Sequence, residues 1–166
     1  MKLKRIKLFF FVTSLQIFIL NNIQFSGYIN PYYYIIFILT IPHKTNKISN
    51  LILSFLIGLT IDVFSNTYGA HAFACVLISY LKIIWTNRFN NKEAEELLEI
   101  TKLSFEKFLI ISTIFIGIHH FTVFSLERFT FLAIWEILGA TIMTTIFTLI
   151  SFIIHKILSS KKHEKA

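Results

Sequence analysis

Apolar stretches of similar length recur along the whole chain, and they constrain the fold more than any other feature. A helix needs about 20 residues to cross a hydrocarbon core of roughly 30 Å, and short polar connections separate stretches of about that length here. We therefore predict an all-α integral membrane protein that forms a single transmembrane domain, residues 1–166. The six predicted crossings are approximately 6–23, 28–41, 48–64, 69–85, 105–124 and 129–157.

The composition argues against a water-soluble domain. Hydrophobic residues make up 55% of the chain and charged residues 15%, and the mean hydropathy is +0.68. A soluble domain of this size normally carries roughly a quarter charged residues. Once a core is filled, too few polar residues remain to cover a surface in water, so lipid must surround most of the chain.

The second and the last predicted crossings depart from the ideal length in opposite directions. As a helix, the stretch from Pro31 to Pro42 spans only about 17 Å, so the chain has five crossings if this segment does not span. Its three tyrosines, 32–34, are expected at the membrane interface. Segment 129–157 is longer than a crossing requires, and its first turns are expected to lie along the interface.

Basic residues are distributed unevenly between alternate connections, and this distribution predicts the orientation. One side receives every Lys and Arg except Arg128, namely Lys2, Lys4, Arg5, Lys7, Lys44, Lys47, Lys82, Arg88, Lys92, Lys102, Lys107, Lys156, Lys161, Lys162 and Lys165. Because Lys and Arg are retained on the cytoplasmic side, both termini are expected in the cytoplasm. We attribute the net charge of +7 to this orientation and to anionic lipid head groups, and not to nucleic-acid binding.

The longest polar connection, residues 86–104, is predicted to be a cytoplasmic loop that contains a short amphipathic helix. Ala94, Leu97, Leu98 and Thr101 recur at the spacing of one helical face. Such a helix is expected to lie on the membrane or to run into the fifth crossing.

Asp62 is the first candidate functional residue, because ionisable side chains inside a bilayer are costly and mark either a function or a packed polar contact. It lies near the predicted outer end of the third crossing, in the run GLTIDVFSNTYG. One interpretation is structural: the carboxylate bonds the turn 66–69 or caps the fourth helix. The other interpretation is a binding or partner contact.

Three further ionisable residues are candidates for polar contacts. His119 and His120 are adjacent, so they project about 100° apart on a helix and are poorly placed to chelate one metal ion together. Glu136 is interpreted either as an interfacial carboxylate or as a partner of Arg128 or of a histidine. We predict no metal site, even with His71 and Glu136 as additional ligands, and the HExxH motif is missing.

Buried amides and small residues are predicted to join helices. Gln16, Asn21 and Asn22 favour hydrogen bonds to a neighbouring helix, with a substrate path as the alternative; they also favour a retained first helix over a cleaved signal peptide. On the last segment, small residues from Ala140 to Ser151 form a stripe. This stripe favours packing within the chain, with a partner interface as the alternative.

The sequence contains no recognisable catalytic machinery. No Ser/His/Asp or Cys/His combination has a plausible spacing, and no phosphate-binding or dinucleotide-binding glycine pattern is present. Cys75 is the single cysteine, which excludes an intramolecular disulfide and a cysteine metal cluster. We therefore predict a protein that is not an enzyme and has no cofactor.

The chain resembles the family of the rod shape-determining protein MreD. The resemblance covers the chain in its length and crossing pattern, and it is most specific in SFLIGLTIDVFSNTYGAHAFACVLISYL, residues 54–81. The best-matching positions are Gly58, Leu59, Asp62, Gly69 and Ala72. They follow the pattern of a helix ending in G-L-x-x-D, followed by a turn glycine and an alanine.

This resemblance implies a non-enzymatic subunit of the cell-wall elongation machinery in the bacterial inner membrane. Its implied partner is MreC and, through MreC, the MreB filaments, the transglycosylase RodA and a class B penicillin-binding protein. The implied role is a multi-pass scaffold that controls rod cell shape during peptidoglycan synthesis, with membrane helices that dock the single helix of MreC.

The alternative is a substrate-binding subunit of an energy-coupling-factor vitamin transporter, which is similar in size and helix count to the MreD family. In that case Asp62, Glu136 and one of the two adjacent histidines would converge on a small molecule near the outer face. Such subunits commonly dock through small residues in the first helix, whereas Leu8–Ile23 is dominated by Phe, Ile and Leu.

Overall fold

The computed structural model describes residues 2–23, 30–42, 45–88, 100 and 103–163, and every regular element within these ranges is helical. The helices are α1 (Lys2–Phe18), α2 (Ile35–Leu39), α3 (Lys47–Ser65), α4 (Ala70–Thr86), α6 (Phe105–Arg128) and α7 (Ile134–His163), with the 3₁₀ turns η1 (Leu20–Asn22) and η3 (Phe131–Ala133).

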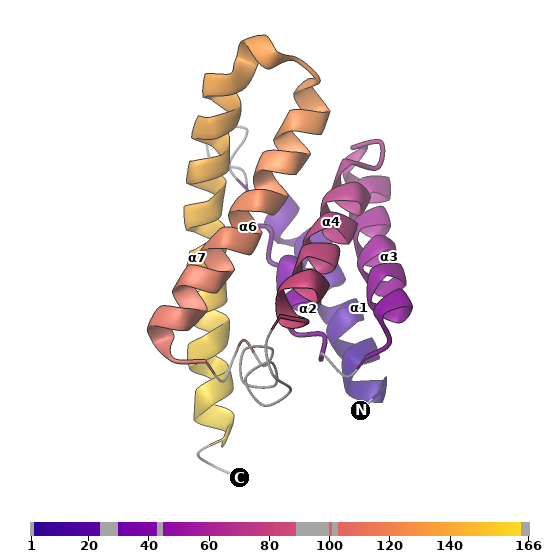
Figure 1. Ribbon diagram of the computed structural model, residues 1–166, viewed down its shortest axis with the longest axis vertical. Helices are drawn as coiled ribbons and strands as arrows, with labels where there is room; N and C mark the ends of the chain where they lie inside the picture. The colour runs from indigo at the N-terminus through magenta and orange to yellow at the C-terminus, as the bar shows by residue number, and fades with distance from the viewer. Residues whose placement is uncertain (1, 24–29, 43–44, 89–99, 101–102, 164–166) are drawn as a thin grey trace.

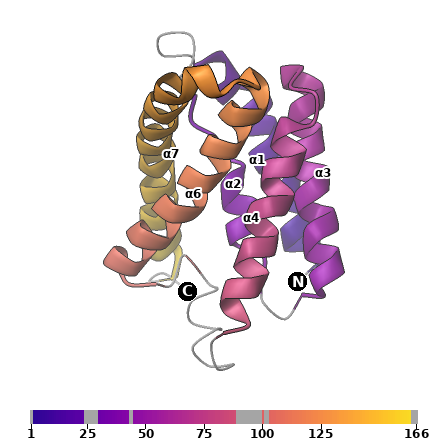
Figure 2. The ribbon, with the colours of Figure 1, turned by 45° about the horizontal axis from the view of Figure 1, so that its top comes forward.

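Two antiparallel hairpins build most of the bundle (Figure 1). One pairs α3 with α4, the other pairs α6 with α7, and α4 also packs against α6. The short helix α2 contacts α1, α3 and α4. Both chain ends lie at one end of the bundle, which we call the terminal end. The turns that close the hairpins, 66–69 and 129–133, lie at the opposite end, which we call the turn end (Figures 1 and 2).

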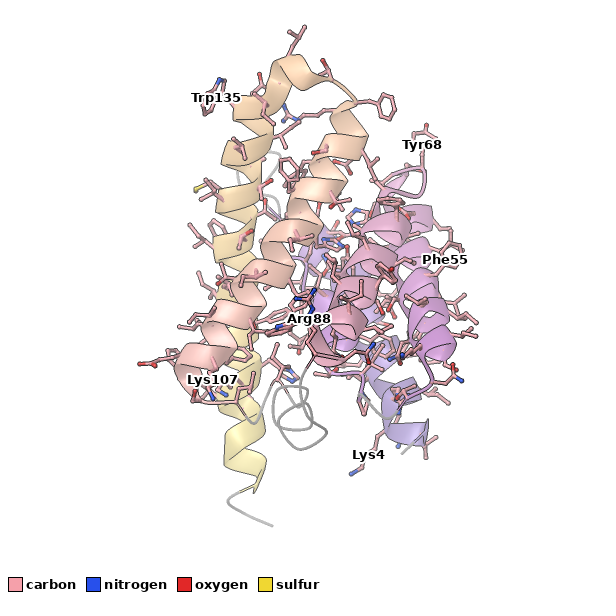
Figure 3. All side chains as sticks on the ribbon, viewed as in Figure 1. Lys4, Phe55, Tyr68, Arg88, Lys107 and Trp135 are labelled. Carbon is pink, nitrogen blue, oxygen red and sulfur yellow. The ribbon has the colours of Figure 1, made fainter. Side chains whose placement is uncertain are left out.

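Large apolar side chains cover the outside of the bundle. Phe10 on α1 is 63% exposed and Phe55 on α3 is 44% exposed, and Figure 3 shows Phe55 projecting away from the other helices. Among the described residues, α3, α6 and the part Ile134–Leu158 of α7 are long and apolar enough to cross a membrane. Because such a surface is stable in lipid and not in water, the chain is a helical membrane protein.

Most of the predicted crossings contain a helix, but the second does not extend as predicted. The prediction of a helix over 28–41 is wrong for most of its described part, since only Ile35–Leu39 is helical there. Pro31 disfavours the helical conformation only in Asn30 before it; beyond Pro31, the N–H of Tyr32 bonds to Thr148 Oγ1 of α7, and the helix begins at Ile35. In the last predicted segment, η3 and α7 replace one continuous helix.

The predicted amphipathic helix of the loop 86–104 lies almost entirely outside the described residues, including its apolar positions from Ala94 to Thr101. The described residues at the end of this loop pack inward. Ile100 and Leu103 are 2% and 7% exposed and belong to the main hydrophobic core, so the loop returns to the bundle before α6 begins.

Gly58 allows α3 and α4 to approach closely. A Cβ atom at Gly58 would lie 2.5 Å from the Cα of Ala72 and 2.6 Å from the carbonyl oxygen of His71. Both distances are far below van der Waals contact, so any larger residue at position 58 would force the two helices apart. Gly58 and Ala72, which carry part of the resemblance to the MreD family, therefore meet at this crossing.

Candidate functional site

Residues 30–41 run through the interior of the bundle from the turn end toward the terminal end (Figure 1). All five residues of α2 are 0–2% exposed, and Tyr34, which precedes the helix, is completely buried. A buried segment with so little helix has backbone N–H and C=O groups that must find partners elsewhere. The polar side chains of the surrounding helices supply these partners.

Lys82 of α4 closes the C-terminal end of α2. Its Nζ donates hydrogen bonds to the carbonyl oxygens of Ile38 at 3.0 Å, Leu39 at 2.8 Å and Ile41 at 2.8 Å. An ammonium group has three N–H bonds, so all three are used, and the positive charge lies where the helix dipole favours it. Lys82 was counted among the basic residues of the loop 86–104 and its helix ends; it lies near the C-terminus of α4, and its side chain is buried.

The other end of the buried segment is held by α1 and α7. Gln16 Nε2 donates to the carbonyl oxygen of Pro31 at 3.1 Å and to Asn21 Oδ1 at 2.9 Å. The backbone N–H of Tyr32 donates to Thr148 Oγ1 of α7 at 3.0 Å. Gln16 therefore joins its helix to a neighbouring segment, as one of its two predicted roles requires.

Tyr34 brings two histidines from different helices together. Its hydroxyl lies 2.6 Å from His71 Nδ1 on α4 and 3.0 Å from His119 Nε2 on α6. His120 turns toward α7 instead, with its Nε2 3.1 Å from Thr148 Oγ1. The two adjacent histidines thus serve different contacts, which agrees with their predicted divergence on a helix.

Cys75 and His119 form a Cys–His pair that the sequence spacing did not predict. The Cys75 Sγ lies 3.7 Å from His119 Nε2, and both side chains are 0% exposed. A nucleophilic cysteine must be reached by its substrate, and reactive cysteines lie in partially exposed surroundings. This pair is instead part of the packed core. Among the described residues no group of three potential metal ligands is assembled.

Asp62 caps the N-terminus of α4 from the neighbouring helix. Its carboxylate accepts hydrogen bonds from Thr67 Oγ1 at 2.5 Å, from the backbone N–H of His71 at 3.0 Å and from that of Ala72 at 2.8 Å. Gly69, the residue at the N-cap position, has a φ of 94° and no side chain to do this. The structural interpretation of Asp62 is therefore the one that the geometry shows, since free N–H groups at a helix start need acceptors.

The remaining predicted residues lie apart from this core. Leu59 is 39% exposed and faces outward. Asn22, in η1, is exposed and donates to the carbonyl oxygen of Phe18 at the end of α1, at 2.8 Å. Glu136 pairs with Arg128 at the turn end and is largely exposed, so it does not converge with Asp62 or the histidines. The threonines of the α7 stripe, 141, 144, 145 and 148, are buried, so this face of α7 packs against other parts of the chain.

A groove of about 550 Å³ lies at the turn end. Residues 66–70 and Phe73 line it from the α3–α4 hairpin, and Leu126, Glu127 and Phe129 line it from the side of α6. We call it the turn-end groove. The sequence did not identify it, because it depends on how two separate hairpin turns are placed relative to each other.

Comparison with known proteins gave no match: no protein-family model, no curated protein and no solved structure is significantly similar to this chain.

Proposed function

We propose that the chain is a non-enzymatic membrane scaffold of the MreD type, acting in the bacterial cell-wall elongation machinery. In this proposal the terminal end faces the cytoplasm and the turn end faces outward across the inner membrane. The charge distribution supports this orientation, since Lys4 and Lys107 lie toward the terminal end while Tyr68 and Trp135 lie at the turn end (Figure 3). Basic residues are retained in the cytoplasm and Trp and Tyr favour membrane interfaces.

The proposal implies six passages between the two membrane faces. Five are the helices α1, α3, α4, α6 and α7, and the sixth is the buried segment 30–41, which returns the chain from the turn end to the terminal end (Figure 1). Irregular backbone is tolerated at membrane depth where protein surrounds it. An even number of passages agrees with both termini lying on one side.

The main support for the proposal is that the buried polar side chains bond to other parts of the same chain. Asp62 caps α4, Lys82 caps α2, and Tyr34 bridges His71 and His119. In this arrangement the interior polar groups support the fold of a broken segment. The exposed apolar helix faces and the turn-end groove remain as surfaces for a partner, and a scaffold needs such surfaces more than it needs a reactive interior.

The partner that the resemblance suggests is MreC, whose single membrane helix would pack against this bundle. Through MreC the chain would reach MreB, RodA and a class B penicillin-binding protein, while lipids cover the remaining apolar surface. Helices in a membrane associate by close packing and by hydrogen bonds between polar residues.

Affinity purification of a tagged chain from its native membrane in mild detergent, followed by mass spectrometry, tests this function. We expect MreC and the elongation synthases to accompany the wild-type chain. Recovery of none of these proteins, from membranes in which MreC is present and detergent-stable, would contradict the scaffold function.

One observation favours a second candidate, the substrate-binding subunit of an energy-coupling-factor transporter. The turn-end groove, at about 550 Å³, falls in the range typical of small-molecule sites. The purification experiment separates the two functions, because this candidate requires ATPase subunits and a transmembrane coupling protein to accompany the chain.

A further inference from the structure

The turn-end groove is bounded by two turns that are distant in the sequence. The α3–α4 turn supplies residues 66–70, and the end of α6 supplies Leu126, Glu127 and Phe129. Ala70, Phe73 and Leu126 are apolar lining residues, and Glu127 is the charged residue among those that line the groove. The groove therefore combines an apolar surface with one negative charge.

Two aromatic residues that line the groove have a backbone conformation that ordinarily favours glycine or asparagine. Tyr68 has a φ of 49° and Phe129 a φ of 45°, and bulky residues rarely adopt this left-handed conformation. Both side chains are exposed, at 102% and 86%, so packing within the chain does not explain their presence. Every described non-glycine residue with a positive φ, namely Asn66, Tyr68 and Phe129, lines this groove.

The charges around the groove favour a cation. None of its lining residues is basic, and no described residue donates a hydrogen bond to the Glu127 carboxylate. The buried Asp62 carboxylate lies behind the groove wall, where it accepts a hydrogen bond from Thr67. Arg128, next to Glu127 in the chain, pairs with Glu136, and its positive charge also acts on the Glu127 carboxylate. Aromatic faces beside a carboxylate are the surroundings that a Lys or Arg side chain prefers.

We propose that the turn-end groove docks an outer segment of the partner protein, with a Lys or Arg side chain of that segment bound between Glu127 and the aromatic rings of Tyr68 and Phe129. This inference rests on the scaffold function, because it assigns a place to the partner which that function requires. The size of the groove favours a peptide segment over an isolated ammonium group, since about 550 Å³ needs several side chains to fill it. Apolar neighbours of the basic residue would cover Ala70, Phe73 and Leu126.

The experiment measures binding of the purified MreC-type partner to the full chain in lipid nanodiscs. We expect Glu127→Gln to weaken binding on the order of tenfold, as loss of a central interface contact typically does, and Glu127→Lys to weaken it further. Glu136→Gln is the matched control: it removes a carboxylate from the same end of the molecule but outside the groove, so binding should change less than twofold.

The outcomes separate the inference from the function on which it rests. If the wild-type chain does not bind the partner, the scaffold function fails. If the wild-type chain binds and the Glu127 variants bind equally well, or if Glu136→Gln weakens binding as much as Glu127→Gln, the docking site proposed here is overturned. Equal thermal midpoints of the variants ensure that folded chains are compared.

A second variant tests the role of the strained aromatic residues. Phe129→Asn places at this position a residue that tolerates the left-handed conformation, so the thermal midpoint should rise or stay unchanged. Partner binding should nevertheless weaken several-fold, because the aromatic face is lost. Unchanged binding by this variant, with Leu132→Asn as an exposed control outside the groove, would show that the ring serves no partner and would overturn its assignment.

Discussion

Two helix ends in this bundle are each closed by a charged side chain from another helix, and the two charges have opposite signs. At the N-terminus of α4, the Asp62 carboxylate accepts hydrogen bonds from the backbone N–H groups of His71 and Ala72. At the C-terminus of α2, the Lys82 ammonium donates to three backbone carbonyl groups. Each charge lies where the helix dipole favours it, so one physical rule explains both ionisable side chains.

The surroundings of the two caps differ. Of the three groups that donate to Asp62, the Thr67 hydroxyl is partly exposed, whereas the backbone N–H groups of His71 and Ala72 are buried. The carbonyl groups bound by Lys82 all belong to residues that are 0–2% exposed, so this cap serves three buried backbone groups and the Asp62 cap serves two. Because an unsatisfied buried polar group is costly, we expect the fold to depend more on Lys82 than on Asp62.

Replacement of Lys82 by methionine should have the largest effect. Lys82→Met keeps the side-chain length but removes a donor from three buried carbonyl groups, of which that of Ile38 keeps the N–H of Ile41. We expect a loss of about 3–5 kcal/mol in stability, comparable to breaking a buried ion pair. The yield of monodisperse protein and the thermal midpoint in detergent measure this loss. Lys107→Met, at an exposed position on α6, is the control, and a similar midpoint for both variants would refute the capping role.

Gly58→Ala should break the α3–α4 crossing that places the Asp62 cap. A methyl group at this position meets the backbone of Ala72 at 2.5 Å, so the helices must separate, at a cost of about 1–3 kcal/mol. Gly117→Ala is a matched control, since a Cβ there meets nothing within 4 Å. The thermal midpoint should fall for Gly58→Ala and stay or rise for Gly117→Ala; equal responses would mean that the crossing is not tight.

Removal of the Asp62 cap should have a smaller effect than either change. We expect Asp62→Ala to lower stability by about 0.5–2 kcal/mol, the usual range for loss of a helix N-cap, and Asp62→Asn to recover part of this because its amide oxygen still accepts a hydrogen bond. Denaturation of both variants in detergent gives the order. With the scaffold function proposed above, Asp62→Ala should insert into the membrane in cells but impair rod shape; normal rods at equal expression would count against an essential cap.

Tyr34→Phe tests the opposite end of α2 from Lys82. Loss of the hydroxyl removes the bridge between His71 and His119 without removing the ring, so a loss of about 0.5–1.5 kcal/mol is expected. Tyr80→Phe is the control, because Tyr80 is 52% exposed. A larger effect for Tyr34→Phe than for Lys82→Met would reverse the ranking and make the histidine contact the main support of the buried segment.

The two caps also differ in how far apart their partners lie in the sequence, and this difference decides what the sequence could predict. Apolar runs located the long helices, since crossing a bilayer requires a fixed length. The sequence could suggest the Asp62 cap, as one of two interpretations, because Asp62 accepts hydrogen bonds from residues only five to ten positions away in the chain. The contacts of Lys82 join residues 41–44 positions apart, and that of Thr148 with Tyr32 joins residues 116 apart. No local pattern encodes such pairs.

The second predicted crossing shows the same limit. Pro31 and Pro42 correctly marked a short segment, but its enclosure by other helices depends on packing that hydropathy does not report. Tyr34 was therefore expected at an interface, whereas it is completely buried and bonded to histidines. The turn-end groove likewise depends on the relative placement of two turns, 66–69 and 129–133.

The buried polar core and the turn end have separate roles in our proposal: the core maintains the fold, and the turn end binds the partner. The most direct measurement is the amount of MreC-type partner bound per folded chain, determined together with the thermal midpoint for Tyr34→Phe and Glu127→Gln. We predict that Tyr34→Phe lowers the midpoint and leaves binding per folded chain unchanged, whereas Glu127→Gln leaves the midpoint unchanged and weakens binding. Loss of binding in folded Tyr34→Phe, with normal binding by Glu127→Gln, would contradict the claim.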